Sequence, residues 1–126
     1  MSMRTPLGRV RGLGSAKSGT EHWWLQRVTA IANIPLVIFL VFFVIRHLGA
    51  SRAEIVASIA NPFVAILLAL TFVSVLWHMR LGLQVVIEDY VHGHVAKFAA
   101  LLANSFVTVL LGVAALYAIL KMSFGL

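Results

Sequence analysis

The residues from Pro62 to Gly93 constrain this chain more than any other part of its sequence. An uninterrupted apolar run extends from Phe63 to Trp77, and helical patterning continues to an acidic and aromatic cluster that ends at Tyr90. Roughly thirty helical residues, at a rise of ~1.5 Å each, form a rod of about 45 Å, longer than the ~30 Å hydrocarbon core of a bilayer. The stretch therefore predicts a transmembrane helix that tilts or protrudes from the membrane.

A histidine, His78, directly follows the tryptophan at the end of this apolar run. This position lies within the membrane, where an ionisable side chain is costly and marks a candidate functional site. The residues His78, Gly82, Val85 and Asp89 follow the spacing i, i+4, i+7, i+11, so they share one face of the helix. At the same helical rise, Asp89 lies about 16 Å along the axis from His78, at the membrane surface.

The residue types on this face suit two ligands. The Nε2 atom of His78 can ligate iron, and the missing side chain of Gly82 lets a flat macrocycle come close. The carboxylate of Asp89 and the phenol of Tyr90 suit a lipid-soluble ligand with a polar head, such as a quinone. The less specific interpretations are a histidine bonded to a neighbouring helix and a hydrated helix end. The acidic pair Glu88–Asp89 opposes the carboxyl-terminal end of the helix dipole, and this misfit favours a functional role.

The composition requires a membrane environment for most of the chain. Of the 126 residues, 61% are hydrophobic and 11% are charged, and a soluble domain of this size could not bury so much apolar surface. The sequence has no cysteine, so disulfides and thiolate metal sites are excluded. The net charge of +6 is concentrated in the amino-terminal part, which fits topology and anionic lipid better than nucleic-acid binding.

The hydrophobic pattern predicts an all-α fold with three transmembrane helices, over about residues 23–47, 62–90 and 98–120. Residues 1–19 form a flexible basic arm, and residues 20–126 form a single anchor domain. Thr20 is the predicted cap of the first span, and Ser51 or Asn61 is a candidate cap for the second. We expect no chemistry on the third span, whose small residues suit close packing.

Two sequence segments resemble the hydrophobic membrane anchor of succinate dehydrogenase, the smaller anchor subunit of respiratory complex II. The run H-M-R-L-G-L-Q-V-V-I-E-D-Y-V-H resembles the second transmembrane helix of that family. In that family a glycine lies four residues after a histidine, and an Asp-Tyr pair lies eleven and twelve residues after it. These positions match His78, Gly82, Asp89 and Tyr90. The segment S-G-T-E-H-W-W-L-Q-R-V-T-A-I-A resembles the start of the family's first helix.

The resemblance implies a subunit of a succinate:quinone oxidoreductase whose flavoprotein and iron–sulfur subunits are separate chains. It implies that His78 is an axial ligand of a haem b shared with a second, cytochrome b-type anchor subunit, so that this chain forms part of a haem-binding helical bundle. Tyr90 would donate a hydrogen bond to ubiquinone, and Asp89 would orient a basic partner or assist proton delivery. We expect no catalytic residue and no activity in the isolated chain. A fumarate reductase anchor and a non-redox structural or assembly protein are the alternatives.

Arg27 and the remaining histidines have open or minor roles. Arg27 is either an interfacial anchor or, by the resemblance, a partner for a haem propionate. His22 and His47, near the ends of segments, are expected to be interfacial. His92 and His94 form an H-x-H pattern in a loop, where solvated residues are more common than metal ligands.

The positive charges predict the orientation of the chain in a bacterial inner membrane or a mitochondrial inner membrane. Arg4, Arg9, Arg11 and Lys17 are concentrated in the amino-terminal arm, and such charges favour the cytoplasmic or matrix side. Three spans then place the carboxyl terminus on the periplasmic or intermembrane side. The Asp89–Tyr90 end of the second span shares the side of the arm, where a soluble electron donor would dock.

Overall fold

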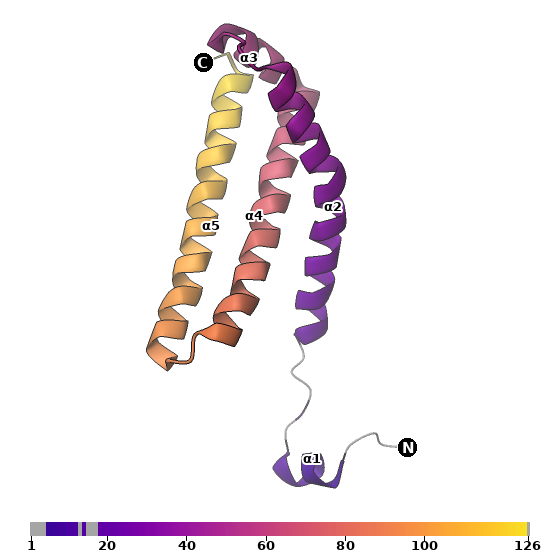
Figure 1. Cartoon of the computed structure of the whole chain (residues 1–126), viewed down its shortest axis with the longest axis vertical. Coiled ribbons are helices and arrows are strands. Elements are labelled where there is room, and N and C mark those ends of the chain that lie inside the picture. Colours follow the sequence, from indigo (N-terminus) through magenta and orange to yellow (C-terminus); the bar gives the residue numbers. More distant parts are fainter. Residues whose placement is uncertain (1–4, 13, 15–17, 126) are drawn as a thin grey trace.

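The computed structural model describes residues 5–12, 14 and 18–125, and the regular structure within these ranges is entirely helical. Its helices are α1 (Pro6–Arg11), α2 (Gly19–Arg46), α3 (Arg52–Ile59), α4 (Pro62–Tyr90) and α5 (His94–Ser123). The prediction of an all-α fold is confirmed. Figure 1 shows α2, α4 and α5 as three long rods, with the short α3 across one end.

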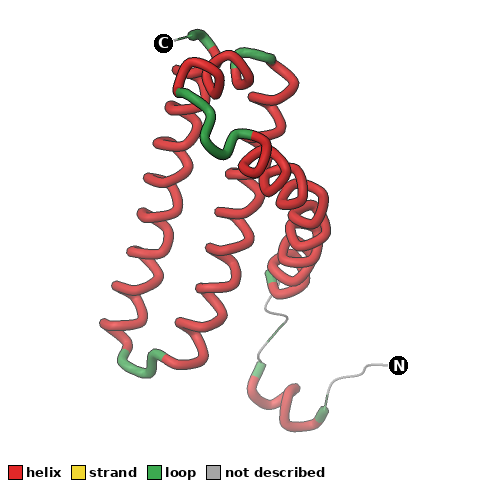
Figure 2. Tube along the Cα trace, turned by 45° about the horizontal axis from the view of Figure 1, so that its top comes forward, coloured by secondary structure: helices red, strands yellow, loops and turns green. Residues whose placement is uncertain are grey.

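The long helices form a row in which α4 lies between the other two. Helix α4 packs against both α2 and α5, whereas the backbones of α2 and α5 do not come close to one another within the described residues. Helix α3 contacts α4 and α5 at the end of the row where α2 finishes and α4 begins, as Figure 2 also shows. The opposite end carries the start of α2, the end of α4 and the start of α5.

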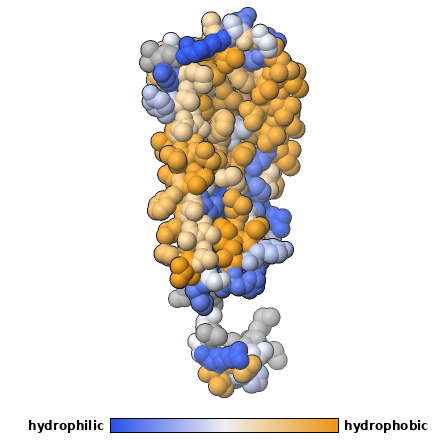
Figure 3. Space-filling view, turned by 60° about the vertical axis from the view of Figure 1, so that its left-hand side comes forward, coloured by the Kyte–Doolittle hydropathy of each residue, from blue (hydrophilic) through white to orange (hydrophobic). Residues whose placement is uncertain are grey.

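All three long helices are apolar enough and long enough to cross a membrane, as the sequence predicts. The observed candidate spans are Gly19–Arg46, Pro62–Tyr90 and His94–Ser123. Most of their apolar side chains are exposed on the surface of the chain instead of being buried inside it. In Figure 3, hydrophobic residues cover the middle of the molecule and hydrophilic residues gather toward its ends. Lipid or another membrane subunit is the environment that such a surface requires.

The connection between the first two spans contains a helix that the sequence analysis did not predict. Ser51 caps α3 through a capping box, in which the Ser51 N–H donates to Glu54 Oε2 at 2.7 Å. Asn61 caps α4, with its Oδ1 accepting from the Phe63 N–H at 2.9 Å. The two candidate caps therefore both act, on different helices. The predicted cap at Thr20 is wrong, because α2 already begins at Gly19 and its N-cap is Ser18.

The main buried cluster lies near α3, away from the end of α4 that carries His78. Its members are Ile59, Ala65, Leu68 and Ile119, and Phe43 of α2 packs against it. The cluster joins all four helices at that end of the row. The other half of the α2–α4 pair has polar contacts between the two helices in addition to the buried side chain of Leu81.

The basic arm contains one short helix, α1. Thr5 caps it by accepting from the Gly8 N–H at 3.1 Å, and Gly12, at a φ of 61°, ends it in the left-handed conformation. Arg9 and Arg11 lie in its last turn, which favours positive charge. The other two basic residues of the arm, Arg4 and Lys17, lie outside the described residues. Helix α1 makes no contact with the other described helices.

Candidate functional site

The side chain of His78 lies between α4 and α2 and is half-buried. Its Nδ1 atom is 3.0 Å from Oγ1 of Thr29 on α2. Its other ring nitrogen, Nε2, makes no hydrogen bond to any residue that the structure describes. The sequence left two interpretations of His78 open, a helix–helix hydrogen bond and a ligand. The structure confirms the first for Nδ1, and Nε2 keeps the capacity for the second.

A polar seam runs along the interface between α2 and α4. The Ser74 hydroxyl of α4 donates to Oδ1 of Asn33 on α2 at 2.7 Å, about one turn from His78. In the other direction along the seam, Gln26 approaches Gly82 of α4. Hydrogen bonds between helices stabilise membrane bundles by about 0.6 kcal/mol on average and up to about 1.7 kcal/mol. The seam therefore fixes the register of α2 against α4.

The residues of this seam on α2 were missed as site residues, although their spacing contains the signal. His22, Gln26, Thr29 and Asn33 follow the spacing i, i+4, i+7, i+11, so they form one polar stripe along an otherwise apolar helix. The same spacing identified the face of α4 that carries His78. A search for polar residues at helical spacing on every span would have found both stripes.

The gap left by the missing side chain at Gly82 faces α2. A Cβ at this position would lie 3.8 Å from Nε2 of Gln26, which is ordinary van der Waals contact. Gly82 is thus placed opposite a side chain of the same protein. A macrocycle could contact α4 at Gly82 only if the side chain of Gln26 moved.

Arg27 points away from the seam into the surroundings of the chain. It is exposed, and its guanidinium lies 5.5 Å from the centre of the Trp23 ring on the same helix. A cation above an indole ring is a common arrangement for an arginine at a membrane interface. The structure does not bring Arg27 into contact with His78 or Gly82.

Arg80 is turned toward α5. Its Nη2 atom donates to Oγ of Ser105 at 3.4 Å, and the Asn104 amide donates to the backbone oxygen of Arg80 at 2.9 Å. The guanidinium also lies 5.6 Å from the centre of the Trp77 ring. Arg80 is therefore held within the protein, although its position on a membrane span had suggested that its guanidinium would extend to the lipid headgroups. The same interactions give α5 polar contacts that the sequence analysis did not assign to it.

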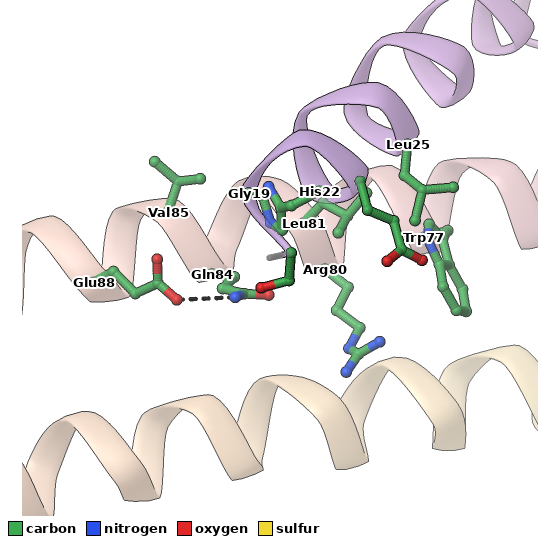
Figure 4. A pocket seen from close by; sticks show the side chains of 11 residues that line it. Gly19, His22, Leu25, Trp77, Arg80, Leu81, Gln84, Val85 and Glu88 are labelled. Carbon is green, nitrogen blue, oxygen red and sulfur yellow. Dashed lines mark hydrogen bonds between the residues drawn. The ribbon is translucent and has the colours of Figure 1, made fainter. Parts of the chain in front are cut away.

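A cavity of about 510 Å³ lies between the start of α2 and the second half of α4. Figure 4 shows it from close by, with the side chain of Arg80 directed toward α5 and a hydrogen bond from Gln84 to Glu88 at 2.8 Å. His22 lines this cavity, and its Nε2 atom is buried without a partner in the described part of the chain. The sequence treated His22 only as an interfacial residue.

Asp89 and Tyr90 lie at the end of α4, where both are exposed. Neither residue lines the cavity between α2 and α4, and Tyr90 retains 77% of its accessible surface. The preceding residue, Glu88, is held in place, because Lys97 of α5 donates to its backbone oxygen at 2.8 Å. The chain alone therefore presents the carboxylate and the phenol on an open surface at the same end of the row as the start of α2.

The other histidines differ from His78 in their surroundings. Both ring nitrogens of His47 are engaged, Nδ1 with the Phe43 backbone oxygen and Nε2 with Oγ of Ser58, each at 2.7 Å. His92 and His94 are exposed. Among the described residues, no group of three or more His, Cys, Asp or Glu could hold a metal ion. An axial haem ligand needs no such cluster, because the macrocycle itself supplies the equatorial nitrogens.

The three apolar helices and the half-buried histidine of the middle helix define an integral membrane protein with a polar inner seam. A family model for the succinate dehydrogenase/fumarate reductase transmembrane subunit matches residues 1–112. The chain belongs to this family. The resemblance seen in the segments around His78 and Arg27 is confirmed.

Curated relatives carry the same description. The succinate dehydrogenase hydrophobic membrane anchor subunit of Paracoccus denitrificans is 33% identical over 96% of this chain and 93% of its own length. Its counterpart in Rickettsia bellii is 32% identical over 92% of this chain and 93% of its own length. The succinate dehydrogenase membrane anchor subunit of Reclinomonas americana is 38% identical over 68% of this chain and 73% of its own. No solved structure matches the chain significantly.

Proposed function

We propose that this chain anchors a succinate:quinone oxidoreductase to the membrane and, with a second anchor subunit, holds a haem b beside a ubiquinone-reduction site. The single observation that carries the proposal is how the two ring nitrogens of His78, on the middle span, are bonded. One ring nitrogen is fixed against α2 at 3.0 Å, and the other makes no hydrogen bond in the described part of the chain. Membership of the succinate dehydrogenase/fumarate reductase transmembrane subunit family supports the assignment to such a complex.

The partners follow from what the chain lacks and from how it is arranged. With no cysteine in the sequence, the chain has no thiolate for an iron–sulfur cluster, so electrons from succinate arrive through separate flavoprotein and iron–sulfur subunits. The row of helices leaves His78 partly uncovered. A second, cytochrome b-type anchor subunit would pack there and supply the other axial ligand.

The haem would be held by residues of this chain in three roles. His78 would provide a ligand nitrogen through Nε2, and the exposed guanidinium of Arg27 would neutralise a propionate. The structure places the Gln26 side chain opposite Gly82, so the macrocycle could pack directly on the α4 backbone there only if Gln26 were displaced, and with Gln26 in place Gly82 would border the haem without touching it. When bound, haem b supplies one-electron chemistry, which lies outside the reach of the side chains themselves.

The quinone contact is assigned to the end of α4. Tyr90 donates its phenolic hydrogen to a quinone carbonyl oxygen, and Asp89 orients a basic partner or delivers a proton. Both residues are exposed, so a partner subunit would complete the pocket above them. Asp89→Asn should lower quinone reduction while succinate oxidation with a soluble artificial acceptor persists. Equal loss of both activities would indicate failed assembly, whereas unchanged quinone kinetics would remove Asp89 from the site.

The test of the haem assignment is a set of histidine variants in the purified complex. Reduced-minus-oxidised spectra should show a b-type signal that is lost or altered in His78→Ala. His92→Ala and His94→Ala are the controls. His92 lies in the loop after α4, and His94 is the first residue of α5 and not a loop residue as the sequence predicted; both are exposed, so they cannot reach an iron between the spans. An unchanged spectrum in an assembled His78→Ala complex would refute the ligand assignment. A wild-type complex without haem would favour a purely structural role.

The orientation is a separate proposal and has its own test. We place the amino-terminal arm on the cytoplasmic or matrix side, because Arg9 and Arg11 of α1 add positive charge there. A reporter fused after the last residue should then behave as periplasmic in a bacterial host. A reporter inserted in the loop between α4 and α5 should behave as cytoplasmic. Two reporters on the same side would contradict the three-span topology.

A further inference from the structure

We propose that Thr29 is the positioning residue for His78: it fixes the proton on Nδ1 and so leaves the lone pair of Nε2 facing the metal. The inference rests on the proposed function, because it assigns a role to Thr29 only if His78 ligates the haem iron. It concerns a residue of α2 that contributes no ligand atom of its own.

The proton count at Thr29 decides the direction of the hydrogen bond. The hydroxyl has a single hydrogen, and Oγ1 lies 2.8 Å from the Leu25 backbone oxygen and 3.2 Å from the Gln26 backbone oxygen. Carbonyl oxygens only accept, so a contact of 2.8 Å between two oxygens requires the threonine hydrogen between them. Without that hydrogen the two oxygens would repel one another. The Thr29 hydroxyl is therefore already used as a donor within α2.

The contact with His78 must then run in the opposite sense. With its hydrogen directed at Leu25, Oγ1 of Thr29 can only accept, and the 3.0 Å contact requires a hydrogen on Nδ1 of His78. A neutral imidazole that carries its hydrogen on Nδ1 has an unprotonated Nε2. This is the tautomer that binds a metal through Nε2. The backbone of α2 thus determines, through Thr29, which nitrogen of His78 is the ligand.

The position of Thr29 is itself set by the seam. The packing of α2 against α4 along the whole seam fixes the register of the two helices, and the 2.7 Å bond between Ser74 and Asn33, about one turn away, is only one of its contacts. That register brings Oγ1 of Thr29 opposite Nδ1 of His78. The hydrogen bond also defines the plane of the imidazole ring, which otherwise could rotate about its two side-chain torsions.

A hydrogen bond at Nδ1 also changes how strongly Nε2 donates to iron. A hydrogen bond from the Nδ1 hydrogen to Thr29 increases the electron density on the ligating nitrogen and makes it a stronger donor to iron. A stronger donor stabilises ferric over ferrous iron. Loss of such an outer hydrogen bond changes metal affinity by about 10- to 100-fold, and a tenfold change in the ferric-to-ferrous preference corresponds to about 59 mV. Removal of the Thr29 hydroxyl should therefore raise the midpoint potential of the haem.

The experiment compares three variants of the whole complex. Thr29→Val keeps the shape of the side chain but removes the acceptor, whereas Thr29→Ser keeps the hydroxyl. Ser74→Ala is the matched control, because it removes a hydrogen bond of the same α2–α4 seam without touching His78. Haem content and the midpoint potential are measured by redox titration of the b-type spectrum. Succinate oxidation with a soluble acceptor reports assembly.

We expect Thr29→Val alone to raise the midpoint potential of the haem, by an amount that corresponds to about a tenfold change in the ferric-to-ferrous preference, or to lose the haem. Thr29→Ser and Ser74→Ala should behave like the wild type. An unchanged midpoint potential in an assembled Thr29→Val complex overturns the inference. An equal change of the potential in Ser74→Ala also overturns it, as does loss of haem in both Thr29→Val and Thr29→Ser. If His78→Ala retains the spectrum, the haem proposal itself has failed. If only the Thr29 result is negative, His78 remains the ligand without this support.

Discussion

Substitution of Gly82 by alanine and by leucine tests whether the space beside Gly82 on α4 is occupied by the Gln26 side chain or by a macrocycle. An alanine Cβ would lie 3.8 Å from Nε2 of Gln26, so it adds an ordinary contact and no clash. Alanine is also more favourable than glycine within a helix by about 1 kcal/mol. Gly82→Ala should therefore leave the haem content unchanged and the thermal stability equal or slightly higher.

Gly82→Leu should behave differently, because three further carbons enter the space of the Gln26 side chain. Overpacking of this kind typically costs about 1–3 kcal/mol and would displace α2 from α4. The assays are haem per complex from the reduced-minus-oxidised spectrum and thermal unfolding in detergent. Gly112→Ala is the matched control, since its Cβ would lie 3.7 Å from Cδ1 of Leu76 at the other interface of α4.

The result that would refute this reasoning is loss of haem in an assembled Gly82→Ala complex, with Gly112→Ala unaffected. A single methyl group would then exclude the ring. The bound macrocycle would have to lie directly on the α4 backbone, with Gln26 displaced from the position that it occupies here.

Three further outcomes can be measured. The Ser51 backbone N–H, followed by the Ser51 hydroxyl, lowers the pKa of Glu54 from its ordinary value of 4.5. This stabilisation of α3 is present above that value and is lost as the pH falls through the lowered pKa. The protection of the α3 amides against exchange, taken relative to the intrinsic exchange rate at each pH, should therefore fall there, and this pH dependence should be absent in Glu54→Gln. Tyr90→Phe should weaken quinone binding by about 1 kcal/mol, which is roughly fivefold in KM, and an unchanged KM would remove the phenol from the site. Asn104→Ala removes the 2.9 Å bond to the Arg80 backbone oxygen and should destabilise the complex by up to about 1.7 kcal/mol without altering the haem spectrum.

The fold could be predicted from the sequence because its dominant signal is strong and local. Long apolar runs identify membrane spans from composition alone, and the Pro62 start and Tyr90 end of α4 coincide with the predicted range. Helix α3 was missed because eight residues between two spans carry a weak pattern. Its capping box, Ser51 with Glu54 three residues later, is a recognisable signal that had been considered only for the longer helix.

The sequence predicted which residues of the candidate site share a face of one helix, but it did not predict the contacts between residues of different helices. Spacing along α4 placed His78 and Gly82 on one face, since that requires only the helical period. The pairing with Thr29 depends on how α2 is rotated and shifted against α4, which no local pattern determines. The same limit explains Arg80, whose contacts with α5 could not be inferred from its own segment.

The single row of helices has a consequence for the biogenesis of the protein. Because the described backbones of α2 and α5 do not come close to one another, the chain does not close around a ligand by itself, and both broad sides of α4 depend on neighbours for cover. Under the proposed function, insertion of the chain into the bilayer and retention of the haem would therefore be separate events, and the second would wait for pairing with another subunit. An orphaned copy would expose its half-buried polar seam to lipid. That exposure distinguishes an unassembled copy from an assembled one, and membrane quality control could recognise it before turnover.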